Sequence, residues 1–359
     1  MIKKLLFFFV SITLSLTGFS QIGGQNTYEF MTLPSSPRIS ALGGHFISVV
    51  DDDVSLAYAN PGLLNPLMHQ KLTINQAFHV AGIKFGYAGY GHYVPKWKTT
   101  FHGGIQYANY GTIDATDITG LVTGTFKAKE FAITAGGAYQ WQEKLSVGAN
   151  VKLITSRFEN YNSVGISSDW AVVYADTAKR LTLTLLAKNI GTQLSTYTEG
   201  NQERLPFEMQ IGLSKRLRHL PFRFSVVYRY FDKWNILYDD PNAEDQVLFL
   251  GEEPQEASDA SVILDNLLRH FVISGEFLLG KSENLRLRFG YSQLQHKEMS
   301  IDNYRSLSGF SVGFGIKVKR FKLDYGRTNF HLGKTVNYIG ISTKLGPFKK
   351  RRRVVRSLG

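Results

Sequence analysis

The feature that most constrains the fold is an alternation of apolar and polar residues that begins near His69 and continues almost to the C-terminus. The clearest stretch is Phe310–Lys319, where Phe, Val and Ile alternate with Ser, Gly and Lys. Successive strand side chains point to opposite faces, so each such segment has one apolar and one polar face. A β-sandwich would bury the apolar face in a core, whereas a transmembrane barrel would turn it toward lipid. The alternation alone allows both folds.

The length and order of the segments favour the barrel. Many segments reach ten residues or more, as a tilted membrane strand requires, and short connections alternate with longer ones, as periplasmic turns alternate with external loops. Aromatic residues lie near segment ends, as at Tyr90, Tyr93 and Trp97, where aromatic girdles form. We therefore predict an all-β fold, a single transmembrane antiparallel β-barrel of about 14 strands. The expected strands are 69–80, 82–94, 99–110, 123–141, 145–158, 163–175, 180–190, 206–217, 222–232, 268–280, 284–296, 306–319, 321–330 and 334–345.

The composition agrees with this fold. The 359 residues include 34 glycines and no cysteine, and 13% are aromatic, a mixture typical of membrane barrels. Without cysteine there is no disulfide framework, no thiolate metal site and no lipid-modified N-terminal cysteine.

The sequence divides into four parts. Residues 1–20 have a basic start, an apolar middle and small residues at the end, which predicts a signal peptide. Residues 21–66 lack strand alternation and are expected to plug the lumen, and residues 67–346 form the barrel. Residues 347–359 are a basic tail, expected in the periplasm. Because both the plug and the tail adjoin the short-connection end of the barrel in this scheme, we expect both termini to be periplasmic.

The net charge of +12 is largely a property of that tail. Its last eleven residues hold six of the positive charges, and Gln21–Phe348 carries only about +4. A basic exported chain whose charge lies in one tail is not expected to bind nucleic acid.

The plug segment contains two features of interest, Asp51–Asp53 and Asn60–Pro61. The three aspartates either form a turn cluster or pair with basic residues of the barrel lumen, and the second interpretation is favoured. Asn-Pro initiates turns, so a short helix over 54–59 is expected to end there. The expected lumenal partners are the basic residues on the polar faces, Arg223, Arg229, Arg286 and Arg288.

A long external loop is expected over 233–267, and it is acidic. From Asp239 to Asp265 there are nine carboxylates and no lysine or arginine. This loop is either a solvated segment held away from anionic lipid or a docking surface for a basic partner. Its segment 257–268 has the pattern of a short amphipathic helix. The candidate docking residues are Asp239, Asp240, Glu244, Asp245, Glu252, Glu253, Glu256 and Asp259.

No catalytic or metal-binding motif stands out. The nine histidines show neither HxxxH nor HExxH spacing, there is no nucleophile elbow, and the adjacent aspartates lack the spacing of an EF-hand loop. We expect a protein without enzymatic activity, cofactor or metal.

Several stretches resemble one family. YEFMTLPSSPRISALGG and SVVDDDVSLAYANPGLL, which follow the signal peptide, resemble the N-terminus of PorQ-type outer-membrane proteins of the type IX secretion system in Bacteroidota, and related PorV-type proteins share the Ala-Leu-Gly-Gly and Asn-Pro elements. Gly111–Ile133, Leu268–Leu279 and Gly309–Gly326 extend the resemblance over nearly the whole chain. Asn60-Pro61-Gly62 is also similar to the Asn-Pro-Ala element of the FadL superfamily, with glycine in place of alanine.

The resemblance implies a location in outer-membrane lipid and a role in the cell-surface attachment complex. There the barrel would hold a PorZ-like surface protein, alongside a sortase and a PorV-like shuttle. The alternative is a FadL-like channel for a hydrophobic small molecule. Such a channel needs a dry apolar pocket and a lateral opening, whereas the expected lumenal residues are Arg, Lys, Ser and Gly, which favours the anchoring role.

Overall fold

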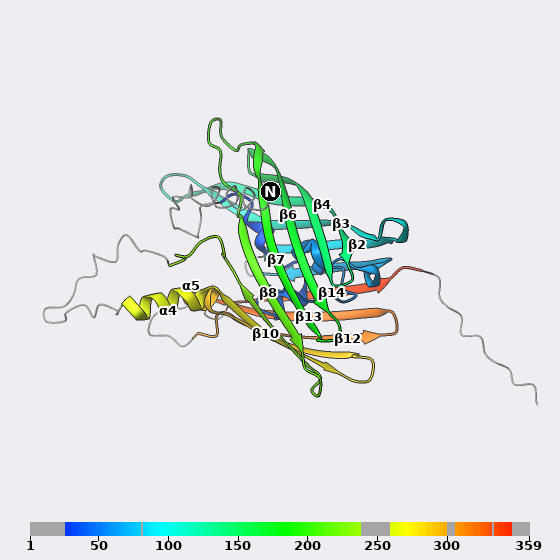
Figure 1. The fold of residues 1–359 in the computed structure, drawn as a ribbon. Helices are drawn as coiled ribbons and strands as arrows, with labels where there is room; N and C mark the ends of the chain where they lie inside the picture. Colours follow the sequence, from blue (N-terminus) through cyan, green and yellow to red (C-terminus); the bar gives the residue numbers. More distant parts are fainter. Residues whose placement is uncertain (1–25, 80–81, 238–258, 300–305, 332–333, 347–359) are drawn as a thin grey trace, which may run out of the picture.

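Fourteen antiparallel strands form one closed barrel in the computed structural model, which describes residues 26–79, 82–237, 259–299, 306–331 and 334–346 (Figure 1). Each strand pairs with its neighbours in sequence, and β1 pairs with β14 to close the ring. The predicted all-β barrel and its strand number are confirmed. The strands are β1 Lys71–Phe78, β2 Lys84–Val94, β3 Thr99–Thr116, β4 Val122–Gln142, β5 Leu145–Phe158, β6 Tyr161–Asp176, β7 Leu181–Ser195, β8 Glu208–Arg216, β9 Phe222–Tyr228, β10 Phe271–Leu279, β11 Leu285–Ser292, β12 Phe310–Val318, β13 Phe321–His331 and β14 Lys334–Lys344.

Two predicted strands run four residues too far at their C-terminal ends. The strand expected over 222–232 ends at Tyr228. The segment expected over 284–296 is a strand only to Ser292, and helix α5 (Gln293–Met299) follows it. Gln293 ends the apolar alternation of Leu285–Tyr291, and Leu294 is out of phase with it. Residues 293–299 include no glycine, proline or β-branched residue, and most of them are strong helix formers. Helix α4 (Asp259–Arg269) lies close to the helix expected over 257–268. Within the described ranges, none of the helices is both long and apolar enough to span a membrane.

The barrel wall is apolar outside and polar inside. On β12 the outward residues Phe310, Val312, Phe314, Ile316 and Val318 are each 41–56% exposed, whereas the inward Ser311 is 2% exposed. The same alternation recurs along the other strands. An apolar outer surface and a polar inner surface are what a barrel in lipid requires.

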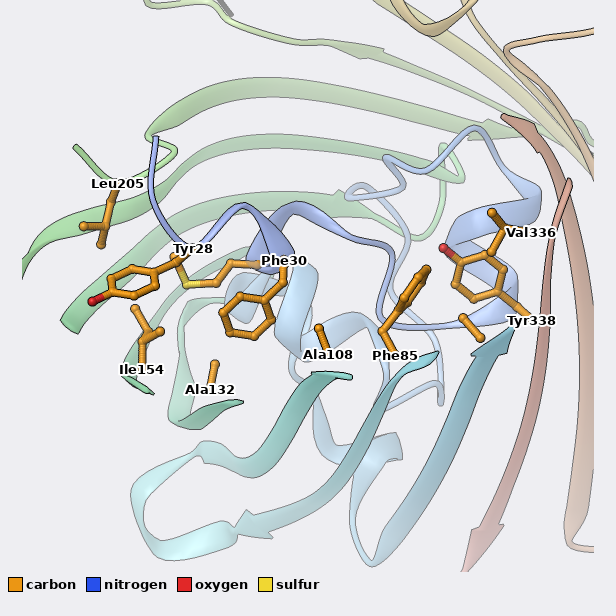
Figure 2. Packing of buried hydrophobic residues seen from close by; sticks show 11 residues of the cluster. Tyr28, Phe30, Phe85, Ala108, Ala132, Ile154, Leu205, Val336 and Tyr338 are labelled. Carbon is orange, nitrogen blue, oxygen red and sulfur yellow. The ribbon is translucent and has the colours of Figure 1, made fainter. Parts of the chain in front are cut away.

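The lumen is filled by residues 26–68, here called the plug. Its buried side chains pack on the wall, and Figure 2 shows Tyr28 and Phe30 extending toward strand residues such as Ile154 and Phe85. Helix α2 lies against β11–β14, and η2 lies against β4, β5 and β6. The helical elements of the plug are η1 Glu29–Thr32, α2 Pro37–Ala41, α3 Leu56–Ala59, η2 Pro61–Leu63 and η3 Pro66–Met68; a further turn, η5 Pro95–Trp97, joins β2 to β3.

The plug runs the length of the barrel. Asn26 pairs with Arg204 in the β7–β8 connection, at the end with the longer connections. The amide of Leu345 donates to Gln70 at the opposite end, where β1 begins. The first and last described residues, Asn26 and Gly346, therefore lie near opposite ends of the barrel. The expectation that both termini are periplasmic concerns residues outside the described ranges and stays a prediction. The sequence scheme assumed that the plug enters beside β1, whereas it reaches β1 only after crossing the lumen. Residues 1–20 and 347–359 lie outside the described residues.

Candidate functional site

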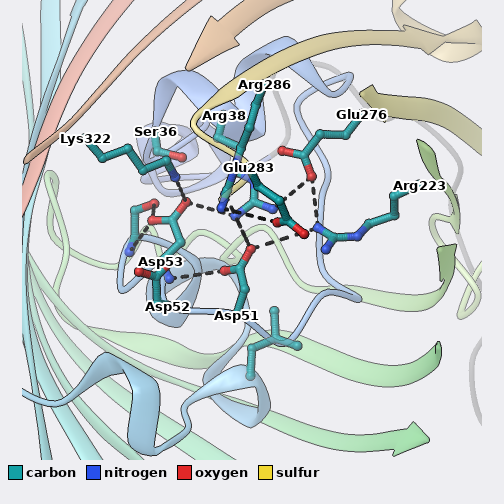
Figure 3. A network of polar contacts seen from close by, with 12 residues as sticks. Ser36, Arg38, Asp51, Asp52, Asp53, Arg223, Glu276, Glu283, Arg286 and Lys322 are labelled. Carbon is teal, nitrogen blue, oxygen red and sulfur yellow. Dashed lines mark hydrogen bonds and ion pairs between the residues drawn. The ribbon is translucent and has the colours of Figure 1, made fainter. Parts of the chain in front are cut away.

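A buried ion cluster joins the plug to the barrel wall, and Arg38 is at its centre (Figure 3). Ser36 caps helix α2, with its Oγ accepting from the amide of Ile39, and Pro37 occupies the first helical position. This start directs Arg38, which is 1% exposed, toward the aspartates. Its Nη1 lies 2.7 Å from Asp51 Oδ2 and 3.1 Å from Asp53 Oδ2.

The wall supplies the other half of the cluster. Glu276 on β10 lies 3.1 Å from Nη2 of Arg38, and its two oxygens also contact Arg223 at 2.9 Å and Arg288 at 2.9 Å. Lys322 Nζ lies 3.3 Å from Asp53, and Arg288 Nη1 lies 2.6 Å from Asp324. These contacts tie the plug to strands β9, β10, β11 and β13.

Opposite charges nearly cancel in the cluster. Five basic side chains and four carboxylates are joined by contacts no longer than 3.9 Å: Arg38, Arg223, Arg286, Arg288 and Lys322 with Asp51, Asp53, Glu276 and Asp324. Buried charges are tolerated only when they are paired and hydrogen-bonded. The arrangement is therefore suited to holding the plug in one position.

The three predicted aspartates have different surroundings. Asp51 lies near Arg38, Arg223 and Arg286, the last two at 3.9 and 3.8 Å. Asp52 pairs with Lys71 of β1, at 2.7 Å. Asp53 also accepts from the amide and hydroxyl of Ser55, so it forms a turn and ion pairs at once.

Asn60 and Pro61 form a tight link inside the lumen. Asn60 Oδ1 accepts from the Gly62 amide at 2.8 Å, and its Nδ2 donates to the Ile47 carbonyl at 2.6 Å. Helix α3 ends at Ala59, as the Asn-Pro pair predicts. A Cβ on Gly62 would lie 2.8 Å from Val173 Cγ2 on β6, which explains why this position carries glycine rather than alanine.

Arg229 is buried but does not join the Arg38 cluster. It follows the last residue of β9 and makes a two-pronged contact with Glu208, at 2.8 and 3.1 Å. Its guanidinium also lies 4.6 Å from the ring centre of Tyr230. The expected pairing of Arg229 with the plug aspartates is therefore absent.

A second polar group, which the sequence did not single out, supports α3. Lys152 Nζ on β5 pairs with Asp169 at 2.8 Å and lies 4.7 Å from the ring centre of Tyr58. Asn150 donates to the carbonyl of Ala57 at 3.0 Å. Asn150, Lys152 and Asp169 lie at lumen-facing positions of β5 and β6, where polar residues alternate with apolar ones. This alternation was the only signal in the sequence that could have identified them.

The expected docking loop is described only where it ends. Asp259 begins helix α4, and the other seven acidic candidates lie outside the described residues. Helix α4 exposes a run of apolar side chains: Val262 39%, Ile263 56%, Leu264 55% and Leu268 44%. Among the described residues, no group of three His, Cys, Asp or Glu side chains is placed to hold a metal ion.

Acid is expected to loosen the plug. Burial alone would raise the pKa of Asp53, but Lys322 and Arg38 outweigh it and hold this pKa below the ordinary value. A carboxyl with a lowered folded pKa stabilises the fold above its unfolded pKa, near 4, and that contribution is lost as the pH falls below this value. The thermal midpoint of the barrel, read from its folded and unfolded bands on a gel, should change little between pH 7 and 5 and drop by pH 3.

The variant Asp53→Asn tests the source of that drop. Its midpoint should be lower than that of the wild type at pH 7 and should fall less between pH 5 and 3. An equal fall in the two proteins would assign the acid sensitivity to other groups.

Comparisons with known proteins identify the fold. No family model matches the chain, and no curated protein matches it. The chain is similar in structure to the toluene transporter TbuX of Ralstonia pickettii, with a TM-score of 0.52, 13% identity and coverage of 87% of this chain and 98% of that one. The monoaromatic hydrocarbon channel CymD gives a TM-score of 0.50, 14% identity and coverage of 88% and 99%. At these identities the likeness shows the fold alone: this chain is a plugged 14-stranded barrel with the fold of these two proteins.

Proposed function

We propose that the protein is a non-enzymatic outer-membrane component of the type IX secretion system that anchors a cell-surface partner of the attachment complex. The observation that carries this proposal is the charged contact between plug and wall. Where α2 meets β10–β13, Arg38, Glu276 and their partners line the lumen with paired charges, which do not suit a hydrophobic solute. The N-terminal resemblance to PorQ-type proteins supports the same role.

The end of the barrel with the longer connections is the docking face in this proposal. It carries the acidic loop 239–256 and the exposed apolar residues of α4, such as Ile263 and Leu264. Clustered exposed apolar side chains beside a charged segment are typical of protein contact sites. A basic, β-rich surface protein of the PorZ type would fit this combination.

The test is affinity purification of the tagged protein from detergent-solubilised envelopes. The wild type should retain the PorZ-like protein, and deletion of 239–256 or the double change Ile263→Asp, Leu264→Asp should lose it. Glu143→Gln, in the exposed β4–β5 turn at the other end, serves as the control and should retain it. Equal recovery of the partner by all variants, or its absence from the wild-type sample, would refute the anchoring role.

A channel for a hydrophobic small molecule is the second candidate. The fold comparisons favour it, because the neighbours are described as a toluene transporter and a monoaromatic hydrocarbon channel. Uptake of radiolabelled toluene and of a long-chain fatty acid should then fall in a deletion strain and return with the wild-type gene. Unchanged uptake, together with partner loss in the loop variants, would leave anchoring as the function.

A further inference from the structure

An open cavity of about 530 Å³ lies between the start of the plug and the barrel wall. It is at the end that carries the β3–β4, β5–β6 and β7–β8 connections. The plug contributes residues 26–29, and the strands and the 196–207 connection contribute the rest. The volume is that of a site for a small ligand or a single large side chain.

Aromatic rings form much of its lining. The ring of Tyr197 lies 6.4 Å from that of Tyr28 and 5.9 Å from that of Phe158, measured between centres. Phe158 in turn lies 5.6 Å from Tyr110. The four rings thus form a continuous chain of contacts along the wall, and the faces of such rings attract cations.

The charged groups in the lining are all carboxylates. Glu29, Glu130 and Glu203 line the cavity, and among the residues that the structure describes no lysine or arginine does. Glu130 on β4 is 2% exposed and accepts a hydrogen bond from the hydroxyl of Tyr110 at 2.5 Å. Lys129 and its partner Arg157 lie nearby in the sheet, but both are exposed on the outer surface.

Glu130 differs from every other buried carboxylate of the described chain. Each of the other five forms an ion pair within the protein: Asp53 with Lys322, Asp169 with Lys152, Asp176 with Lys144, Glu208 with Arg229 and Glu276 with Arg288. Glu130 forms none with any described residue. A buried carboxylate normally has a cationic partner, and here the cavity is where that partner can sit.

We infer that this cavity binds an organic cation, an ammonium or guanidinium group attached to an apolar or aromatic body. The charged group pairs with Glu130, and the body contacts the rings of Tyr28, Phe158 and Tyr197. The inference does not depend on either proposed function. The same chemistry is offered by a small amine and by a lysine or arginine side chain of a protein partner, and the experiment separates them.

The test is calorimetric titration of the purified full-length barrel in a non-ionic detergent, which carries no ammonium group, at low ionic strength. The probes are phenethylammonium, N-acetyl-arginine amide and, as an anion of similar shape, 3-phenylpropionate. Both cations should bind, and the anion should not. Tighter binding of phenethylammonium would indicate a small amine as the ligand, and tighter binding of N-acetyl-arginine amide would indicate a side chain of a protein partner. Glu130→Gln should weaken binding at least tenfold, and Tyr197→Leu should weaken it about tenfold. Glu143→Gln should change it less than twofold.

Three results would overturn the assignment. One is equal binding of 3-phenylpropionate, which would indicate a merely apolar pocket. Another is unchanged cation binding in Glu130→Gln, which would show that this carboxyl is not the partner. The last is binding of calcium, titrated as its chloride at millimolar concentration, with no binding of either organic probe, which would indicate a site for an inorganic ion. Retention of the folded gel band by each variant shows that lost binding is not lost folding.

Discussion

Replacing Glu276 with glutamine is expected to release the plug from the barrel wall and to cost about 3–5 kcal/mol of stability, the usual range for breaking a buried ion pair. The change keeps the shape of the side chain, removes its charge and replaces one acceptor oxygen with an NH2 donor. Arg38, Arg223 and Arg288 would then surround a neutral amide. The five basic groups of the cluster, four of them buried and Arg223 partly buried, would face three carboxylates instead of four.

Two measurements would detect the release of the plug. Amide hydrogen exchange of residues 35–46 should become faster, because α2 loses its link to β10, and ion conductance in planar bilayers should increase as the lumen opens. Glu143→Gln removes the same charge from an exposed turn and should behave as the wild type. Slow exchange and low conductance in Glu276→Gln would mean that apolar packing alone holds the plug.

Gly290→Val is expected to prevent α2 from docking. Gly290 faces the lumen on β11, and a Cβ there would lie 2.2 Å from the Gly43 nitrogen and 2.4 Å from the Leu42 carbonyl carbon. Both atoms are backbone, so no side chain can rotate away. Overpacking of this kind typically costs about 1–3 kcal/mol, and we expect the upper part of that range together with faster exchange over residues 36–46.

The matched control is Gly103→Val on β3. A Cβ at that exposed position would meet nothing closer than Thr134 O at 4.0 Å, and valine is favoured in strands. Its thermal midpoint should equal or exceed that of the wild type. If both valine variants lowered the midpoint equally, loss of glycine in the sheet rather than collision with the plug would be the cause.

The barrel could be predicted from the sequence because its signal is local. Alternation within β12, for example, places Phe314 outside and Ser311 inside without reference to any other strand. The end of a strand is set less sharply by this signal. The alternation of β11 is broken at Gln293, where α5 begins, but a break of one or two residues also occurs inside strands.

The site was harder to predict because it joins distant residues. Charge alone indicated that the plug aspartates would meet lumenal arginines, and Asp51 does lie near Arg223 and Arg286. The central role of Arg38 had no such signal, since the plug has no repeating pattern from which orientation can be derived. For Arg229 the sequence predicted the lumenal position correctly but the wrong partner, because it pairs with Glu208 and not with the plug aspartates. Charge type can be inferred from sequence, whereas the choice among partners depends on the fold.

The route of the plug has a consequence for assembly. Strands β1 and β14 are the first and last to be made, and their pairing is the seam that closes the ring. The plug touches both sides of this seam: Asn75 of β1 donates to the Ser35 carbonyl at 2.9 Å, and α2 packs against β14. A closed ring cannot easily admit a chain that is already attached to one of its own strands. We therefore expect β1 and β14 to pair only after the plug is in place, so that the plug links the first and last strands of the sheet from inside the barrel.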